Sequence, residues 1–480
     1  MNRLVSLIFI LSIFAISVAS IKENPTGTEP CEVKAFPGAE GFGTSTPGGR
    51  GGKIIYVTTL NDSGEGSLRS ALTASGPRLV LFRVSGTITL EKDIVIKEPY
   101  LTIAGHTAPG EGVQIRGAQI HIETHDIIIR YLKVRSGDLI DASTEDERDA
   151  ITINKLDQAY NIVIDHSTLI WGPDIGGLSF LNGTHDATVS YSIMGEGLYI
   201  SHHPEGIQAT DGHSMAMNIT ELDSPIPPKR ITAHHNLLTT SADRNPRVIG
   251  GENIDIVNNV IYNWKNSASQ GNPRSLNLIN NMYIPGPMTT NPLAHFIWIP
   301  KVEAGGSLHY SSVYETGNLT ENFIKQTKSP SGVYVDTRFS PYSMLAKEDS
   351  AKTAYNKVLR DAGANLQVNT AAGDFRIARD SVDQRIIDNV LHRTGVLVNG
   401  VDYDNVGGFP AISWPKLQGG SEAIDDDLDG MPDAWEQTYF HNTHRGSPDR
   451  SKSDYDKDGY TDVEEYLNRT NPVRPEMCRR

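Results

Sequence analysis

Apolar residues along this chain recur mostly at every second position, in short runs separated by polar turns. Alternation with a period of two predicts β-strands that bury one face. Almost no room for a helix is left between the runs. The strands predicted from this pattern are Lys53–Thr58, Leu79–Val84, Thr87–Leu90, Asp93–Ile96, Leu101–Ile103, Val113–Arg116, Gln119–Glu123, Asp126–Val134, Ala150–Ile153, Ile162–Ile164, Gly177–Leu181 and Ala187–Tyr191.

A repeated pattern indicates how such strands are arranged. A five-residue motif that ends at Asn236 returns with its last residue at Asn259 and at Asn281, so the asparagines lie 23 and then 22 residues apart. A strand-rich unit repeated at this period predicts a solenoid, in which each coil stacks on the last and buries one apolar column. We therefore predict an all-β fold, a right-handed parallel β-helix, in which these asparagines stack into a hydrogen-bonded ladder.

Three segments predict short helices instead. Gly66–Leu72 is expected to cap the open end of the solenoid, because terminal repeats need a cover. Ser350–Ala362 and Arg379–Leu391 are expected to lie against its side. Residues 35–415 are thus predicted to form the β-helix domain with its flanking helices, and a linker around Gly407–Gly420 ends it.

Residues 1–20 are typical of a secretory signal peptide, with Arg3 as the positive start, an apolar run and small residues for cleavage. A transmembrane anchor is the alternative, but the apolar run is short and no basic stop-transfer segment follows it. No other stretch is long and apolar enough to span a bilayer. We expect a secreted protein, extracellular or periplasmic, with a polar tether at residues 21–34 and no membrane segment after cleavage.

Charge is concentrated near the C-terminus. The whole chain carries a net charge of −15, and the segment from Glu422 to Glu465 holds 14 acidic and 4 basic residues, a net of −10. This local excess of acid indicates ion binding, and the lack of a basic stripe argues against a nucleic-acid partner. Cys31 and Cys478 are the only cysteines, which are too few for a zinc site and form a candidate disulfide in a secreted protein.

Two twelve-residue stretches of the acidic segment carry acids at positions 1, 3, 5, 9 and 12 and glycine at position 6. This is the ligand pattern of an EF-hand loop, because Ca²⁺ takes six to eight oxygens and the glycine makes the sharp turn. An acidic solvated linker is the alternative. Since no clear helix precedes either loop, we expect a separable EF-hand-like, dockerin-type module over residues 422–471. Its structural calcium ligands would be Asp425, Asp427, Asp429, Asp433 and Glu436, and Asp454, Asp456, Asp458, Asp462 and Glu465.

Several short segments of the β-helix domain match sequence motifs of a known enzyme family. They are Ala35–Gly43, Gly48–Lys53, Gly66–Leu72, Leu101–Gly110, Asp126–Arg135, Asp149–Ile151, Ile164–His166, Thr232–Asn236 and Arg244–Arg247. Each is weak alone, but in this order they resemble the pectate lyase superfamily, in particular the first polysaccharide lyase family in its secreted bacterial form. The resemblance implies calcium-dependent β-elimination of polygalacturonate. In that chemistry calcium neutralises the uronate carboxylate and acidifies the adjacent C5 proton, which a base removes.

Arg244 matches the catalytic arginine of this family, the first residue of its Arg-x-Pro motif. The role requires a guanidinium to lose a proton transiently, although arginine is otherwise always protonated. A structural ion pair with a neighbouring aspartate such as Asp243 is the alternative. For substrate binding, the resemblance offers Arg247, because Ile249 stands where relatives often carry a second arginine, and His213, which falls closest to a family lysine.

The resemblance also implies calcium ligands near the catalytic arginine at Glu147, Asp149 and Asp174. Glu147 and Asp149 lie two residues apart on one strand and therefore point to the same face. Ile175 stands where relatives commonly add another acid. The alternative to a calcium site is that these acids only keep an external loop solvated. Of the other histidines, His166 is expected to serve the internal hydrogen bonding of its coil.

We therefore expect a secreted pectate lyase that uses Ca²⁺, acts on an anionic polysaccharide and is a monomer. A polygalacturonase on the same fold is one rival, but it needs paired carboxylates around a water, and its Asn-Thr-Asp and Gly-His-Gly signatures are absent. A non-catalytic glycan-binding solenoid is the other rival, because fold alone does not decide function.

Overall fold

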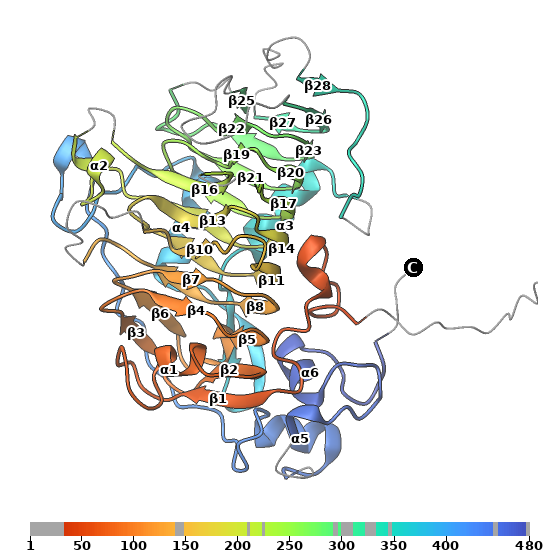
Figure 1. Cartoon of the computed structure of the whole chain (residues 1–480). Coiled ribbons are helices and arrows are strands. Elements are labelled where there is room, and N and C mark those ends of the chain that lie inside the picture. The colour runs from red at the N-terminus through yellow and green to blue at the C-terminus, as the bar shows by residue number, and fades with distance from the viewer. Residues whose placement is uncertain are drawn as a thin grey trace, which may run out of the picture.

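The computed structural model describes residues 33–139, 148–208, 212–222, 226–290, 296–298, 311–321, 333–343, 348–444 and 450–476. Within these residues, three parallel sheets run along a common axis, and the central coils of the chain give one strand to each sheet (Figure 1). Successive sequence segments therefore stack as neighbours, which is the predicted parallel β-helix.

The three sheets, in the order of their hydrogen-bonded strands, are as follows. Sheet A contains β1 (Lys53–Val57), β2 (Arg78–Phe82), β5 (Leu101–Ala104), β8 (Ile127–Arg130), β11 (Tyr160–Asp165), β14 (His185–Ser190), β17 (Lys229–His234), β20 (Glu252–Val257), β23 (Leu276–Ile279), β26 (Val313–Thr316) and β28 (Tyr334–Val335). Sheet B contains β3 (Gly86–Thr89), β6 (Val113–Arg116), β9 (Lys133–Arg135), β12 (Thr168–Ile170), β15 (Ile193–Gly195), β18 (Leu237–Thr239), β21 (Val260–Tyr262), β24 (Met282–Ile284) and β27 (Leu319–Thr320). Sheet C contains β4 (Ile94–Ile96), β7 (Ile120–Ile122), β10 (Ile151–Ile153), β13 (Ile175–Leu181), β16 (Met215–Thr220), β19 (Arg247–Ile249), β22 (Ser269–Asn272) and β25 (Phe296–Trp298).

Aliphatic side chains in register form the core between the sheets. In sheet A, Ile129 pairs with Ile164, which pairs with Val189, and all three are fully buried. Full burial of such a side chain contributes about 1.5–3 kcal/mol. The period-two pattern of the sequence is thus the pattern of residues that face this column.

The asparagine ladder is present and one step longer than predicted. The Nδ2 group of Asn236 donates to Oδ1 of Asn259 over 3.0 Å, and Asn259 donates to Asn281 over the same distance. Asn281 in turn donates to Asn318, also over 3.0 Å. Asn236, Asn259 and Asn281 are fully buried, so these bonds satisfy amides that water does not reach.

One predicted strand is in fact two. The segment predicted as a single strand from Asp126 to Val134 contributes β8 to sheet A and β9 to sheet B, with a corner at Tyr131. Tyr131 adopts φ 55°, which turns the chain from one sheet to the next. An apolar run that continues through the corner hid this boundary, since Leu132 is also buried.

Short helices cover the solenoid, as predicted. Helix α1 (Leu68–Leu72) buries Leu68, Ala71 and Leu72 in the main core. The others are α2 (Pro204–Gln208), α3 (Ala351–Asp361), α4 (Ser381–His392), α5 (Asp433–Phe440) and α6 (Asp462–Asn468), with the 3₁₀ helices η1 (Phe42–Ser45), η2 (Gly105–Thr107), η3 (Val406–Gly408) and η4 (Arg450–Lys452) and the antiparallel pair β29 (Leu366–Asn369) and β30 (Asp374–Ile377). In the part of the chain that the structure describes, no helix has the length and apolar character needed to cross a membrane.

The C-terminal module with α5 and α6 lies beside the first strands of sheet A (Figure 1). Leu79 and Leu81 of β2 belong to one apolar cluster with Trp435 of α5 and Val463 of α6. The sequence suggests a separable appendage, whereas this shared cluster joins the module to the solenoid.

Candidate functional site

The candidate residues lie at one edge of sheet C. Asp149, Asp174, His213 and Arg244 come one to three residues before β10, β13, β16 and β19, respectively, which are neighbouring strands. Because the strands are parallel, their starting ends meet at the same edge. Residues that are up to 95 positions apart in the chain are therefore brought to one place.

Arg244 faces Asp174. Its Nη1 atom lies 3.6 Å from Oδ1 of Asp174, and the Arg244 side chain is 15% exposed. Asp243 makes other contacts, because its carboxylate accepts hydrogen bonds from the Asn266 amide and the Ser267 hydroxyl. The aspartate that Arg244 faces is thus Asp174, a predicted calcium ligand.

Asp174 is an ionised acceptor in this arrangement. Its Oδ1 atom accepts a hydrogen bond from Nε2 of His213 over 2.8 Å. Burial by itself would raise the pKa of Asp174, but the bond from His213 and the charge of Arg244 outweigh burial and lower it. The side chain is 25% exposed, so this charged group borders on solvent at the edge of the sheet.

Asp149 lies behind Asp174 and is only 2% exposed. Its Oδ1 accepts the backbone N–H of Ile175 over 3.1 Å, and its Oδ2 accepts the Thr152 hydroxyl over 2.8 Å. Burial, together with the negative charge of Asp174, raises the pKa of Asp149 well above its ordinary value. A cation bound here would stabilise the two carboxylates, because their negative charges repel each other.

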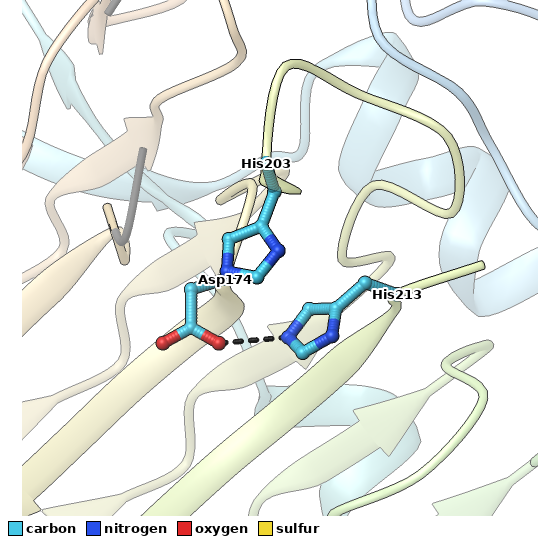
Figure 2. Close-up of side chains that lie close together, drawn as sticks. All are labelled: Asp174, His203 and His213. Atoms are coloured by element: carbon cyan, nitrogen blue, oxygen red, sulfur yellow. Dashed lines mark hydrogen bonds and ion pairs between the residues drawn. The ribbon is translucent and has the colours of Figure 1, made fainter. Parts of the chain in front are cut away.

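His213 lies between His203 and Asp174 (Figure 2) and also contacts Glu205. Nε2 of His213 faces Asp174, and Nδ1 lies 2.9 Å from Oε2 of Glu205, which contributes the second carboxylate. The His203 ring stacks on His213 with centroids 4.2 Å apart, and His203 is 6% exposed. Both ring nitrogens of His213 therefore face a carboxylate.

Asp174, His203 and His213 each offer a ligand atom within 4.8 Å of the others. Imidazole nitrogens suit zinc, copper or nickel, whereas Ca²⁺ prefers oxygen. Because the ring planes of the two histidines are nearly parallel, at 19°, their nitrogen lone pairs do not converge on one point. Of the predicted calcium ligands, Asp149 and Asp174 supply oxygens, and Glu147 lies outside the described residues.

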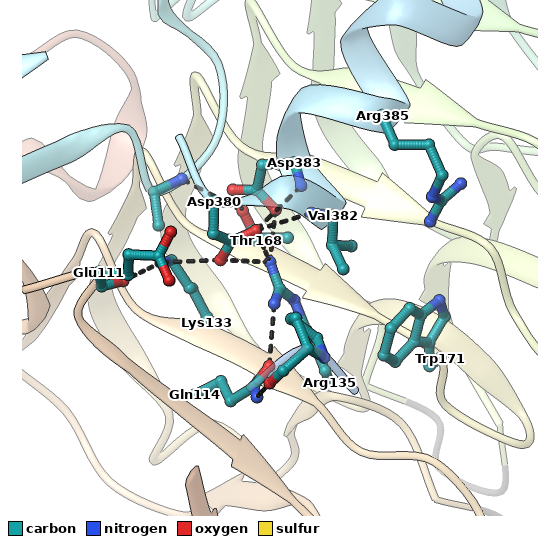
Figure 3. A network of polar contacts seen from close by, with 12 residues as sticks. Glu111, Gln114, Lys133, Arg135, Thr168, Trp171, Asp380, Val382, Asp383 and Arg385 are labelled. Carbon is teal, nitrogen blue, oxygen red and sulfur yellow. Dashed lines mark hydrogen bonds and ion pairs between the residues drawn. The ribbon is translucent and has the colours of Figure 1, made fainter. Parts of the chain in front are cut away.

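Trp171 lies shortly before Asp174 in the chain and is hydrogen-bonded to Glu196. Its Nε1 donates to Oε2 of Glu196 over 3.0 Å, and Arg385 of α4 forms a two-pronged ion pair with Glu196. Arg135 fixes the start of the same helix through Asp380 and Asp383 (Figure 3). The loop at the start of β13 is thus linked to α4 through the buried carboxylate of Glu196.

Arg247 lies on sheet C beside Arg244, but it is 7% exposed. Its Nε atom donates to Oδ1 of Asn218 over 3.1 Å. The strand register places it in a row of polar residues that crosses the sheet, formed by Thr152, Ser179, Asn218, Arg247 and Gln270. This row borders the edge that carries Asp149, Asp174 and Arg244.

The two acidic loops of the C-terminal module have the geometry of cation sites. Carboxylate oxygens of Asp425, Asp427 and Asp429 lie within 4.8 Å of one another, and so do those of Asp454, Asp456 and Asp458. The glycines at position 6, Gly430 and Gly459, adopt φ 92° and 101°, so that each loop turns sharply. Asp433 and Asp462 each accept a backbone N–H from their own loop, over 3.0 and 2.9 Å.

Buried carboxylates in these loops are the strongest sign of a cation. Burial, followed by the charges of neighbouring acids, raises the pKa of Glu465 to about 9. The same two causes raise the pKa of Asp456 to about 6. Glu436 and Glu465, both at position 12, are fully buried. A divalent ion with oxygen ligands would balance these charges, so the residues present fit calcium.

Some predictions fall outside the described residues, namely the signal peptide, Glu147, Cys31 and Cys478. His166 serves internal bonding, as expected, through a 2.7 Å contact with Asp165. The sequence motifs do not single out Glu205 or His203. A histidine in a surface loop usually has no functional role, so His203 carries little signal by itself. A histidine-rich loop between two strands of a repeat, Gly195–Ser214, is the signal that points to them.

No family model matches the chain. Its relatives include two fungal proteins named "Probable pectate lyase C". That of Emericella nidulans is 32% identical over 409 residues, which cover 83% of this chain and 84% of the relative. That of Aspergillus terreus is 32% identical over 455 residues, which cover 90% and 93%.

Among solved structures, the thermostable pectate lyase PL 47 aligns with 70% of this chain and 99% of its own, at 17% identity and a TM-score of 0.50. This likeness concerns the fold, and together with the stacked sheets it confirms the predicted right-handed parallel β-helix.

Proposed function

This chain belongs to the pectate lyase family, and on that premise we propose that it cleaves α-1,4-polygalacturonate by β-elimination, with Arg244 as the base. The observation that carries the proposal is the meeting of Arg244 with Asp174 at the edge of sheet C, 3.6 Å apart, beside Asp149. A cation-dependent elimination needs a base next to acids that hold the cation, and these residues provide both.

The elimination breaks the C5–H bond, and its electron pair forms the C4=C5 double bond while the C4–O bond breaks. Arg244, as the neutral guanidine, takes the C5 proton, and the leaving sugar oxygen takes a proton from solvent water. The products are 4,5-unsaturated oligogalacturonides. Arg247 and His213 are the proposed substrate-binding residues, as the family resemblance implies, and the positive charge of Arg247 would attract a polyanion.

Asp149 and Asp174, together with Glu147, would hold Ca²⁺ at this site. When bound, the ion neutralises the substrate carboxylate and makes the C5 proton more acidic. Asp174 contacts Arg244 and is also a proposed ligand of the cation, so the acids and the arginine form one unit.

The C-terminal loops are proposed as structural calcium sites, with the five acids of each loop as ligands. The protein is proposed to be secreted as a monomer after removal of residues 1–20. The named relatives are fungal, although the sequence motifs suggest the bacterial form.

Ultraviolet absorbance of a polygalacturonate digest tests the function. A lyase yields a product that absorbs because of its new double bond, whereas a hydrolase releases only reducing ends and a binding protein releases neither. Absorbance that rises with calcium supports the proposal. Reducing ends without absorbance would assign the hydrolase, and no product would leave a glycan-binding solenoid.

A further inference from the structure

Glu465, at position 12 of the second C-terminal loop, has an unusual environment for an acidic residue. It is fully buried, and neither carboxylate oxygen has a hydrogen-bond partner among the residues that the structure describes. Burial, together with the negative charges of Asp456, Asp458, Asp462 and Asp454, raises the pKa of Glu465 to about 9. A buried charge without a partner is costly unless a cation binds it.

The module also makes polar contacts with the first coils of the solenoid. Glu464, next to Glu465, bonds with both oxygens to Nε of Arg50 over 2.9 Å. His106, at the end of β5, bonds to the backbone oxygen of Leu467 in α6 over 3.1 Å. Helix α6 therefore begins among the calcium ligands and is held on the solenoid along its length.

The first loop touches the solenoid directly. The hydroxyl of Tyr56 in β1 donates to Oδ2 of Asp425, the residue at position 1 of that loop. The backbone at Gly430 packs closely against Leu81 and Ile54, since a Cβ atom there would lie 3.1 and 3.4 Å from their side chains. A change in this loop is therefore transmitted to β1 and β2.

We propose that Ca²⁺ in the two C-terminal loops fastens the module onto the first coils of the β-helix, so that the stability of β1, β2 and β5 depends on calcium. The inference rests on the structural calcium sites proposed above and is independent of the lyase activity. Without the ion, buried carboxylates repel one another at the base of α6. With it, the loops close and α5 and α6 are held against Leu79 and Leu81.

The first test is thermal unfolding of the full mature chain in excess calcium and in chelator, with magnesium as a second ion. We expect calcium to raise Tm by ~5 °C or more, because a ligand that binds only the folded state stabilises it. Magnesium should do less, since it requires a stricter octahedral geometry. Equal Tm values in calcium and chelator would overturn the proposal.

Glu465→Gln separates the loop ion from any other calcium. The substitution keeps the shape of the side chain and removes the buried charge, so Tm in chelator should rise while the gain from calcium shrinks by about half or more. Glu91→Gln, an exposed glutamate near the same end of the solenoid, is the matched control and should respond to calcium as the wild type does. A full calcium response in Glu465→Gln would contradict the assignment of this loop.

Hydrogen exchange locates the effect. Calcium should slow exchange of backbone amides in β1, β2 and β5 by tenfold or more, in addition to those of α5 and α6. Tyr56→Phe removes the bond to Asp425 and should reduce protection in β1 while α6 stays protected. Protection confined to the module would show that the ions order only the module and would overturn the fastening role.

Discussion

His213 donates a hydrogen bond from Nε2 to Oδ1 of Asp174 over 2.8 Å. That same oxygen is the one nearest to Nη1 of Arg244, at 3.6 Å. The histidine therefore sets where the carboxylate points, and the carboxylate sets where the guanidinium lies. A residue that the sequence suggests for substrate binding has, in the structure, a contact with a proposed calcium ligand.

His213→Leu should lower kcat/KM by about 10–100-fold, because a hydrogen bond to a charged group contributes about 1.5–3 kcal/mol. His213→Gln should retain most of the activity, since its amide N–H reaches the position of Nε2. His392→Gln, at an exposed helix end, is the control for loss of a histidine as such. Steady-state kinetics on polygalacturonate measure the three variants, and equal losses in Leu and Gln would show that the bond to Asp174 is unimportant.

Asp149→Asn should raise the calcium concentration needed for half-maximal activity without unfolding the solenoid. Asparagine keeps an oxygen for the backbone N–H of Ile175 and a polar group for the Thr152 hydroxyl. Alanine would leave both of these groups without that partner. The variant loses the negative charge that a cation requires.

Calcium titration of activity, with circular dichroism to confirm folding, checks Asp149→Asn. Asp157→Asn, at an exposed turn, serves as the control acid. An unchanged calcium requirement in Asp149→Asn would place the catalytic ion elsewhere.

The stacked fold could be predicted because it repeats. Asn236, Asn259 and Asn281 recur at the period of one coil, and each residue type meets its own kind in the next coil. The grouping of the acids with Arg244 comes from the family resemblance, and the structure accounts for it because each of these residues precedes a strand of one sheet.

Contacts between parts of the chain that do not repeat could not be predicted from the sequence. Glu205 reaches His213 through a loop whose path no periodicity fixes. The corner at Tyr131 lies within an apolar run, and only its backbone angle marks it. The contact of Tyr56 with Asp425 joins residues 369 positions apart, which no local pattern reveals.

Acid should destabilise the fold through His106. Burial, with the charge of Arg130, lowers the pKa of His106 to about 3, so the folded state keeps the ring neutral. The unfolded chain takes up a proton below its ordinary value of about 6.5, so this stabilisation is present above pH 6.5 and is lost as pH falls from there towards 3. The slope is at most ~1.4 kcal/mol per pH unit.

His106→Gln removes this titration while keeping an N–H for the backbone oxygen of Leu467. Its free energy of unfolding should fall less steeply between pH 6.5 and 4 than that of the wild type. Urea unfolding at several pH values measures both slopes. Parallel pH profiles would show that His106 does not contribute to acid sensitivity.

Arg244→Lys should abolish turnover, by at least about 100-fold in kcat, while substrate binding is largely kept. Lysine retains the positive charge that attracts polygalacturonate, but it lacks the planar, forked guanidinium that fixes each nitrogen. If the arginine were only the ion-pair partner of Asp174, lysine would replace it with a loss of about 0–1 kcal/mol, the value of a partly exposed pair. The two roles therefore predict different outcomes for the same conservative substitution. Lys265→Arg is the control at another site.

The rate of unsaturated-product formation measures turnover, and retention on immobilised polygalacturonate measures binding. Near-normal turnover in Arg244→Lys would remove it from the role of base and direct the search to Arg247, whose Nε is already engaged by Asn218.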